Sequence, residues 1–158
     1  ACPSSGNTLL PLTVSHTLNQ LAIAGVNAAS VNQVVASPAS NLAFVTYTGT
    51  TTGAQLPYYV PGTGGAAGTL SYVTLTGNSS ITAPVAGAFS PDDTIFFVST
   101  SGDDEIHYID VKTLTDTQQI SPNLPACTPG TDQGCTLPAA QSAPVPATVI
   151  VVKPRSTT

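Results

Sequence analysis

The sequence predicts an all-β fold built from four-stranded antiparallel units. Threonine, valine, isoleucine, tyrosine and phenylalanine cluster in short runs, and glycine, proline, asparagine and aspartate separate these runs. No long segment carries apolar residues at the helical spacing i, i+3, i+4, i+7. One pattern of residues occurs twice, first around residue 37 and again around residue 90, which indicates two copies of one strand-rich unit.

Each of these runs is expected to form a strand. A run begins where β-branched and aromatic residues gather, and it ends at the next turn former. Most prolines lie between the runs, where the missing N–H removes no ladder hydrogen bond. The expected strands cover residues 12–23, 31–36, 42–48, 56–60, 69–76, 85–89, 94–100, 105–111, 116–120 and 148–153.

The first unit covers residues 31–84. Its opening strand ends at the Ser37-Pro38 turn, and its second strand ends at Gly49, because both sites carry residues that favour turns. Residues 50–68 are interpreted as a Gly-rich insertion that carries the run from Leu56 to Val60.

The second unit covers residues 85–120. Up to Gly102 it repeats the first unit without a gap, at an offset of 53 residues. After the insertion, the match resumes at an offset of 36 residues. The aligned segments are Ser37-Pro38 with Ser90-Pro91, Phe44-Val45 with Phe97-Val98, Gly49 with Gly102, and Tyr72-Val73-Thr74-Leu75 with Tyr108-Ile109-Asp110-Val111. Each unit is therefore expected to form one four-stranded antiparallel blade.

The second unit resembles the blade motif of the YVTN-type β-propeller family. The features that match are the Ser90-Pro91-Asp92 turn, the following strand with Val98, the Ser101-Gly102-Asp103 turn and the strand with Ile109-Asp110. The first unit departs from the family motif, since Ala39-Ser40 stands where the acids should be. The resemblance implies β-propeller-like blades.

Two blades are too few for a closed ring, because propellers close with about 4–8 blades. The predicted fold is therefore incomplete as a single chain, and its open faces and edges must be covered from elsewhere. Either the chain is the C-terminal part of a longer propeller, or identical chains complete one another. In the second case Val149, Ile150, Val151 and Val152 would form an assembly strand that adds to an exposed edge.

Three further segments flank the blades: an N-terminal strand segment at 1–30, a Pro-rich stapled loop at 121–146, and a C-terminal strand and tail at 147–158. A disulfide between Cys127 and Cys135 is expected in the loop, because turn formers fill the short segment between them. Free thiols and a metal pair are the alternatives. Cys2 is left over as an interchain or lipid-bearing cysteine. A disulfide favours a secreted or cell-surface location, here expected in a bacterium.

Charged residues make up only 7% of the chain, against roughly 25% in an ordinary soluble domain. Three basic residues stand against eight acids, so no basic surface is available for nucleic acid. No apolar run approaches the length that a membrane span needs. The low charge fits a chain that packs against copies of itself, since like-charge repulsion is small.

No catalytic residues, metal site or cofactor are expected. A calcium site built from Asp92, Asp93, Asp103, Asp104 and Glu105 is disfavoured, because the expected strand 94–100 puts the two acidic turns at opposite ends of the blade. Turn acids that accept local N–H bonds are the preferred interpretation, and a local cation at 103–105 is the alternative. His16 and His107 are the only histidines, and His107 is expected to be an ordinary strand-surface residue.

Two features could serve binding. Tyr58 and Tyr59 could contact a glycan or a protein, although successive strand residues face opposite ways. Asn78 heads the sequence Asn78-Ser79-Ser80 and is a glycosylation candidate.

The sequence thus predicts a secreted, non-enzymatic structural protein. It would self-associate through β-blades and edge strands into an extracellular filament or surface assembly, with identical subunits as partners. The alternative is a protein- or glycan-binding module at the C-terminal end of a secreted YVTN-like propeller.

Overall fold

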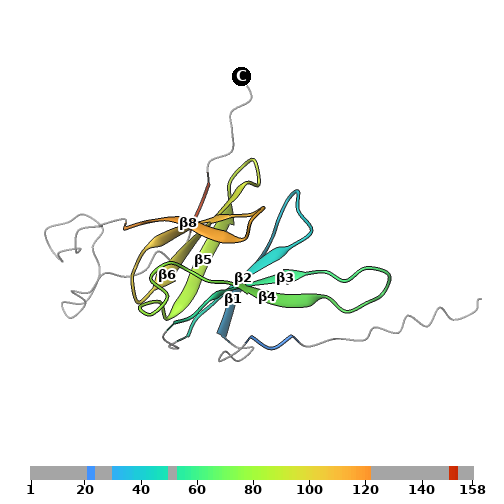
Figure 1. The fold of residues 1–158 in the computed structure, drawn as a ribbon, viewed down its shortest axis with the longest axis horizontal. Coiled ribbons are helices and arrows are strands. Elements are labelled where there is room, and N and C mark those ends of the chain that lie inside the picture. Colours follow the sequence, from blue (N-terminus) through green and yellow to red (C-terminus); the bar gives the residue numbers. More distant parts are fainter. Residues whose placement is uncertain (1–20, 24–29, 50–52, 122–149, 153–158) are drawn as a thin grey trace, which may run out of the picture.

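The computed structural model describes residues 21–23, 30–49, 53–121 and 150–152, and these contain eight strands and no α-helix. The strands form two antiparallel sheets of four, in the orders β1-β2-β3-β4 and β5-β6-β7-β8 (Figure 1). The predicted all-β fold of four-stranded, blade-like units is confirmed, and the two sheets do not close into a ring. The strands are β1 (Val31–Ala36), β2 (Ala43–Tyr47), β3 (Leu56–Val60), β4 (Thr69–Val73), β5 (Ala83–Phe89), β6 (Ile95–Ser101), β7 (Ile106–Asp110) and β8 (Thr115–Ile120).

One part of the repeat alignment is wrong. The run from Leu56 to Val60, interpreted as part of an insertion, is the regular third strand of the first sheet. In the register, Phe44 of β2 lies opposite Tyr58 of β3, just as Phe97 of β6 lies opposite Tyr108 of β7. Tyr58 is therefore the counterpart of Tyr108, and the extra residues of the first unit lie in the loops on either side of β3. Because β3 lacks the Ile-Asp ending of β7, the local sequence match passed over it.

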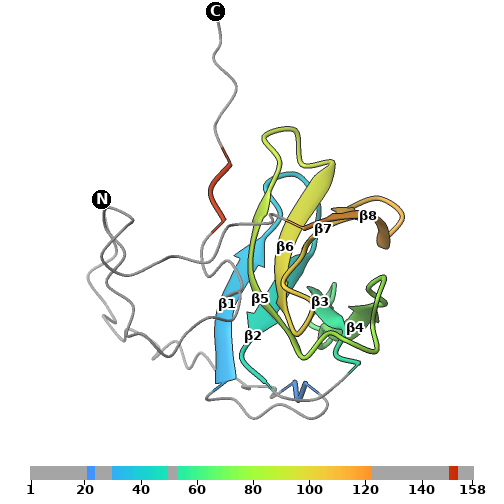
Figure 2. The same cartoon turned by 90° about the vertical axis from the view of Figure 1, so that its left-hand side faces the viewer.

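The two sheets pack face to face, with β5 lying against β1 and β2 (Figure 2). The centre of this interface is aromatic: the rings of Phe44 and Phe96 are stacked, with centroids 4.4 Å apart and planes 19° apart. Both side chains are fully buried, and Phe89 packs against each of them. Full burial of one such side chain stabilises a fold by about 1.5–3 kcal/mol, so this cluster is a main tie between the sheets.

Gly87 of β5 makes room for this aromatic cluster. A Cβ atom at this position would lie 2.3 Å from Cζ of Phe96, which is far inside van der Waals contact. On the neighbouring strand β1, the Gln33 side chain accepts a hydrogen bond from the Gly87 N–H, and the Asn32 amide donates to the Val85 carbonyl. Side chains of β1 therefore satisfy part of the inner edge of the second sheet.

A buried carboxylate joins the turns of the two sheets. Asp93 lies in the β5–β6 turn and is 8% exposed. Its Oδ2 accepts hydrogen bonds from the Ser37 hydroxyl at 2.5 Å, the Ala39 N–H at 3.2 Å and the Ser40 hydroxyl at 3.2 Å. Its backbone φ of 57° is a conformation that aspartate tolerates better than most residues. The β1–β2 turn of the first sheet is thus capped by a residue of the second.

Candidate functional site: an open sheet face and a buried histidine network

The outer face of the second sheet carries an aromatic pair. Phe97 of β6 and Tyr108 of β7 are both partly exposed, and their rings meet edge to face with centroids 4.9 Å apart and planes 82° apart. Strand alternation puts Phe96 and Val98 on the inner face, where both are fully buried. Phe97 and Tyr108 therefore point away from the first sheet.

The same pair recurs in the first sheet, where it is covered. Phe44 meets Tyr58 edge to face with centroids 6.2 Å apart, and Phe44 is buried against Phe96 of the second sheet. Phe97 is thus the residue that corresponds to Phe44 both in the sequence repeat and in the sheet register. The second sheet presents outward the pair that the first sheet uses to dock on its neighbour.

Along β2, the outer face of the first sheet is buried. Ala43, Val45 and Tyr47 alternate with Phe44, and all three are buried. Val45 and Tyr47 belong to the core cluster that also contains Ile23. The described residue Ile23 comes from the chain before β1, so part of the N-terminal segment packs into this cluster. The outer face of the first sheet also carries Tyr72 of β4, which is 38% exposed, so each sheet presents aromatic side chains on its outer face.

Each sheet also has an outer edge strand. Within the described ranges, no further strand pairs with the outer side of β4 or of β8. β8 is polar and largely exposed, and it contains neither proline nor lysine, two residues that discourage edge-to-edge pairing.

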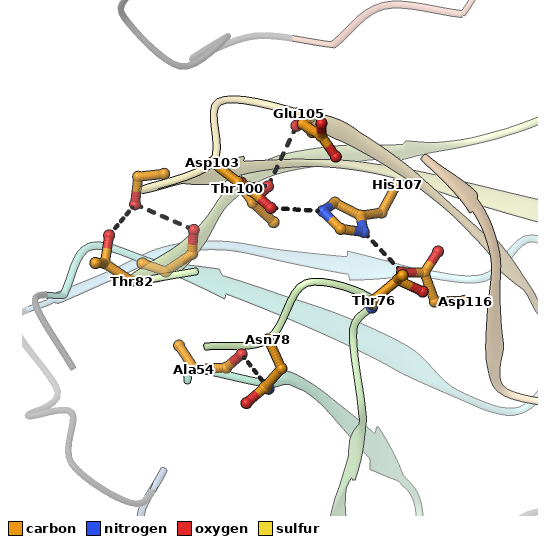
Figure 3. A network of polar contacts seen from close by, with 11 residues as sticks. Ala54, Thr76, Asn78, Thr82, Thr100, Asp103, Glu105, His107 and Asp116 are labelled. Atoms are coloured by element: carbon orange, nitrogen blue, oxygen red, sulfur yellow. Dashed lines mark hydrogen bonds and ion pairs between the residues drawn. The ribbon is translucent and has the colours of Figure 1, made fainter. Parts of the chain in front are cut away.

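A second feature is a polar network around a buried histidine (Figure 3). The prediction that His107 is a strand-surface residue is wrong, because its side chain is fully buried between the sheet and the linker after β4. Its Nδ1 lies 2.7 Å from Oδ2 of Asp116, and its Nε2 lies 3.2 Å from Oδ2 of Asp103. The Thr76 N–H donates to the same Asp116 oxygen at 2.7 Å, and the Thr100 hydroxyl donates to Asp103 Oδ1 at 2.5 Å.

This network sets the charge states of its members. Burial lowers the pKa of His107, but hydrogen bonds and attraction from Asp116 and Asp103 outweigh burial and raise the pKa above its ordinary value. Burial raises the pKa of Asp116, yet the contacts with His107 and with the Thr76 N–H lower it overall. Folding thus favours the imidazolium form of His107 and the carboxylate form of Asp116 relative to the unfolded chain.

The acidic turns occupy opposite ends of β6, as the sequence predicts, so Asp92 and Asp103 form no common site. Asp92 accepts hydrogen bonds from the Ser90 hydroxyl and from the Thr94 hydroxyl and N–H, which lower its pKa to about 2. Asp93 differs from the simple turn acids expected, because it binds side chains and a backbone N–H of the β1–β2 turn. Asp103 contacts side chains of its own hairpin, those of Thr100 and His107.

Several predicted site residues lie outside the described residues: Cys2, Cys127, Cys135, Val149 and His16. Ile150 and Val152 are partly exposed, Val151 is 85% exposed, and none of the three lies in a strand.

The two tyrosines and the glycosylation candidate are all engaged within the fold. Tyr58 packs on Phe44, and the Tyr59 ring lies over Gly68, where a Cβ would be 2.2 Å from the tyrosine oxygen. The Asn78 amide donates to the Ala54 carbonyl at 3.1 Å.

Comparisons with protein-family models, with curated proteins and with solved structures gave no significant match. The resemblance to YVTN blades is therefore carried by the residues quoted above alone. In the described part of the chain, no helix is long and apolar enough to cross a membrane.

Proposed function

We propose that this chain is a non-enzymatic structural protein that associates with identical chains through its blades and free edge strands. The observation that carries the proposal is the outward-facing pair of Phe97 and Tyr108. Its counterpart, Phe44 with Tyr58, docks one sheet on the next within the same molecule. A surface that repeats a working contact is a reasonable place for another copy to bind.

The size of the contact decides what else must take part. Two aromatic side chains bury at most about 150–250 Å² each, whereas a stable interface buries about 1,200–2,000 Å² in total. The aromatic pair would thus form the centre of an interface. Edge pairing along β8 would extend it through backbone hydrogen bonds.

The partner surface determines the type of assembly. If Phe97 and Tyr108 of two chains meet each other, the contact closes into a dimer with two-fold symmetry. If this face or the β8 edge meets a different surface of the next chain, the contact repeats and produces a filament. The small number of charged residues opposes neither arrangement.

A secreted or cell-surface location, YVTN-type ancestry and contacts with glycans belong to the same proposal. They rest respectively on the cysteine spacing, on the repeat motif and on the aromatic pair of Tyr58 and Tyr59 in the sequence.

The test is to measure the mass of the full chain as a function of concentration by light scattering and sedimentation, followed by electron microscopy. The unmodified chain should form species well above 15.9 kDa. Phe97→Ser and Tyr108→Ser should weaken association at least about tenfold while the far-ultraviolet circular dichroism stays unchanged, since one buried aromatic contact is worth about 1.5 kcal/mol or more.

Tyr72→Ser is the comparison variant. Tyr72 is a 38% exposed tyrosine of β4 and lies on the outer face of the first sheet, opposite Pro57 in the register. Its substitution should leave a two-fold contact between second sheets unchanged, and should weaken association only where the first sheet's outer face is the partner surface. A chain that stays monomeric at all concentrations would overturn the proposal. It would favour the alternative, in which the open face receives another blade of a longer propeller or a different binding partner.

A further inference from the structure

The β6–β7 hairpin gathers three side chains with metal-binding atoms. Asp103, Glu105 and His107 each offer one ligand atom, and these atoms all lie within 4.8 Å of one another. Glu105 and His107 are two residues apart, so an extended chain directs them to the same side. The turn is closed by the Thr100 N–H, which donates to the Glu105 carbonyl at 3.0 Å.

The imidazole is oriented as in protein metal sites. Metal-binding histidines usually donate their second ring N–H to a carboxylate, which fixes the ring and the tautomer. Here Asp116 lies 2.7 Å from Nδ1 of His107, and the Thr76 N–H holds Asp116 in place. In a neutral ring whose Nδ1–H donates to Asp116, the lone pair of Nε2 is directed toward Asp103.

The spacing of the ligand atoms suits a small ion. Two ligands of a tetrahedral zinc ion lie about 3.3 Å apart, because each bond is about 2.0–2.1 Å long. The Nε2 of His107 and Oδ2 of Asp103 are already 3.2 Å apart. Glu105 is partly exposed, and its carboxylate lies within 4.8 Å of both these atoms, where it could complete the third position.

The charge around the imidazole is not balanced. Three carboxylates, those of Asp103, Glu105 and Asp116, surround one histidine, so the group stays negative even when the ring is protonated. Lys112 is the single lysine or arginine in the described ranges, and it belongs to the β7–β8 turn. Among the described residues, Oδ1 of Asp116 is one of three buried side-chain oxygens without a hydrogen-bond partner, the others belonging to Thr46 and Asp93.

We infer that Asp103, Glu105 and His107 bind a divalent transition-metal ion of the zinc class, with Asp116 positioning the histidine and with water in the remaining coordination position. An imidazole ligand favours zinc, copper or nickel over calcium, which prefers oxygen ligands alone. The bound ion would tie the β6–β7 turn to β8 and, through Thr76, to the linker from the first sheet. This inference does not depend on self-association.

The experiment titrates the full chain with ZnCl₂ by calorimetry, after reduction and alkylation of the three cysteines so that thiolates cannot bind the metal. The imidazole signals of His107 are followed in parallel by NMR, with His16 as the internal reference. We expect binding at a 1:1 ratio, with a shift of the His107 signals and not of the His16 signals.

Two substitutions locate the site. Glu105→Gln removes a partly exposed ligand whose loss need not disturb the buried network, and it should weaken zinc binding at least tenfold. Asp104→Asn makes the same change of charge one residue away, and asparagine tolerates the φ of 58° at that position. It should alter the affinity less than threefold.

Three results would overturn the inference. They are absence of zinc binding up to millimolar concentration, binding that leaves the His107 signals unmoved, and equal weakening by Glu105→Gln and Asp104→Asn. The last would indicate diffuse attraction to an acidic turn. None of these results bears on the mass measurements that test association.

Discussion

The two sheets use matching positions in different ways. Phe44 and Tyr58 in the first sheet are packed against the second, whereas the corresponding Phe97 and Tyr108 remain partly exposed. Whether the phenylalanine of a blade is buried therefore depends on the sheet packed beside it, and not on the strand that carries it. Because the second sheet forms with Phe97 and Tyr108 partly exposed, this pair is not required to be covered for the blade to fold and is available for contact with a partner.

The Ser-Pro turns show the same contrast. The Ser37 turn of the first sheet is capped by Asp93 from the second sheet, whereas Ser90 of the second sheet donates its hydroxyl to Asp92 within its own turn. Asp92 stands where the first unit has Ala39, which carries no acceptor. The first turn thus depends on a neighbour, and the second is satisfied locally.

The largest expected difference lies between the two phenylalanines. Phe44→Ala should lower the free energy of unfolding by about 3–5 kcal/mol, because it removes a fully buried ring from the stack with Phe96. Phe97→Ala should cost about 1–2 kcal/mol in the monomer, since its ring is only partly buried. Urea unfolding at low protein concentration measures both. Equal losses would mean that Phe97 is already covered.

An intermediate effect is expected at the carboxylate between the sheets. Asp93→Ala should cost about 2–3 kcal/mol, because it leaves the hydroxyls of Ser37 and Ser40 without their acceptor and puts alanine at a φ of 57°. Asp93→Asn keeps an acceptor and tolerates that φ, so it should cost less. Asp92→Ala should cost less than Asp93→Ala. The reverse order in thermal unfolding would show that the first turn does not rely on its neighbour.

The smallest expected effect is the pH dependence that the histidine network gives to stability. The first sheet has no such network, because Pro57 occupies the position in β3 that His107 has in β7. Because folding raises the pKa of His107, this residue contributes stability that is fully present below pH 6.5, its ordinary pKa. The contribution is lost as the pH rises through the pKa of the folded state. The lowered pKa of Asp116 adds stability that is present above 3.8 and is lost as pH falls through its folded value. Stability from this pair should therefore be greatest between these limits.

His107→Gln tests this account in buffer with EDTA, which keeps metal ions away. At pH 5.5 it should cost about 1–3 kcal/mol, and the decline in stability above pH 6.5 should become shallower. His16 is present in both proteins, so its titration cancels in the comparison. An unchanged alkaline slope would assign the pH dependence to other groups.

Sequence reasoning recovered the strands because they depend on local patterns. The bounds of β1 and β3 were predicted to the residue, and those of the other described strands to within a few. The strands expected at 12–23 and 148–153 were wrong where the structure describes them, because residues 21–23 and 150–152 lie in no strand. The equivalence of Phe44 and Phe97 was also visible from the repeat. The equivalence of Tyr58 and Tyr108 was not, because a proline and a different ending mask the third strand of the first unit.

The histidine network could not be predicted, because it depends on register. His107 lies opposite Gln119, and Asp116 lies opposite Ile109, with a register shift between Tyr108 and Ile109. This shift brings Asp116 within reach of His107, and no residue pattern announces it. The network also includes the Thr76 N–H, which donates to Asp116 from 40 residues away in the sequence.

The cap that Asp93 provides also has a temporal aspect. Ser37 and Asp93 are 56 residues apart, and a chain made from its N-terminus presents the first turn to solvent well before residue 93 has been synthesised. Until then, the hydroxyls of Ser37 and Ser40 can bind only water, and Phe44 lacks the ring of Phe96 on which it stacks. The first sheet can reach its final packing only after the β5–β6 hairpin has emerged from the ribosome. The turn that is synthesised first therefore obtains its last hydrogen bonds later than the turn that follows it, which needs only its own residues.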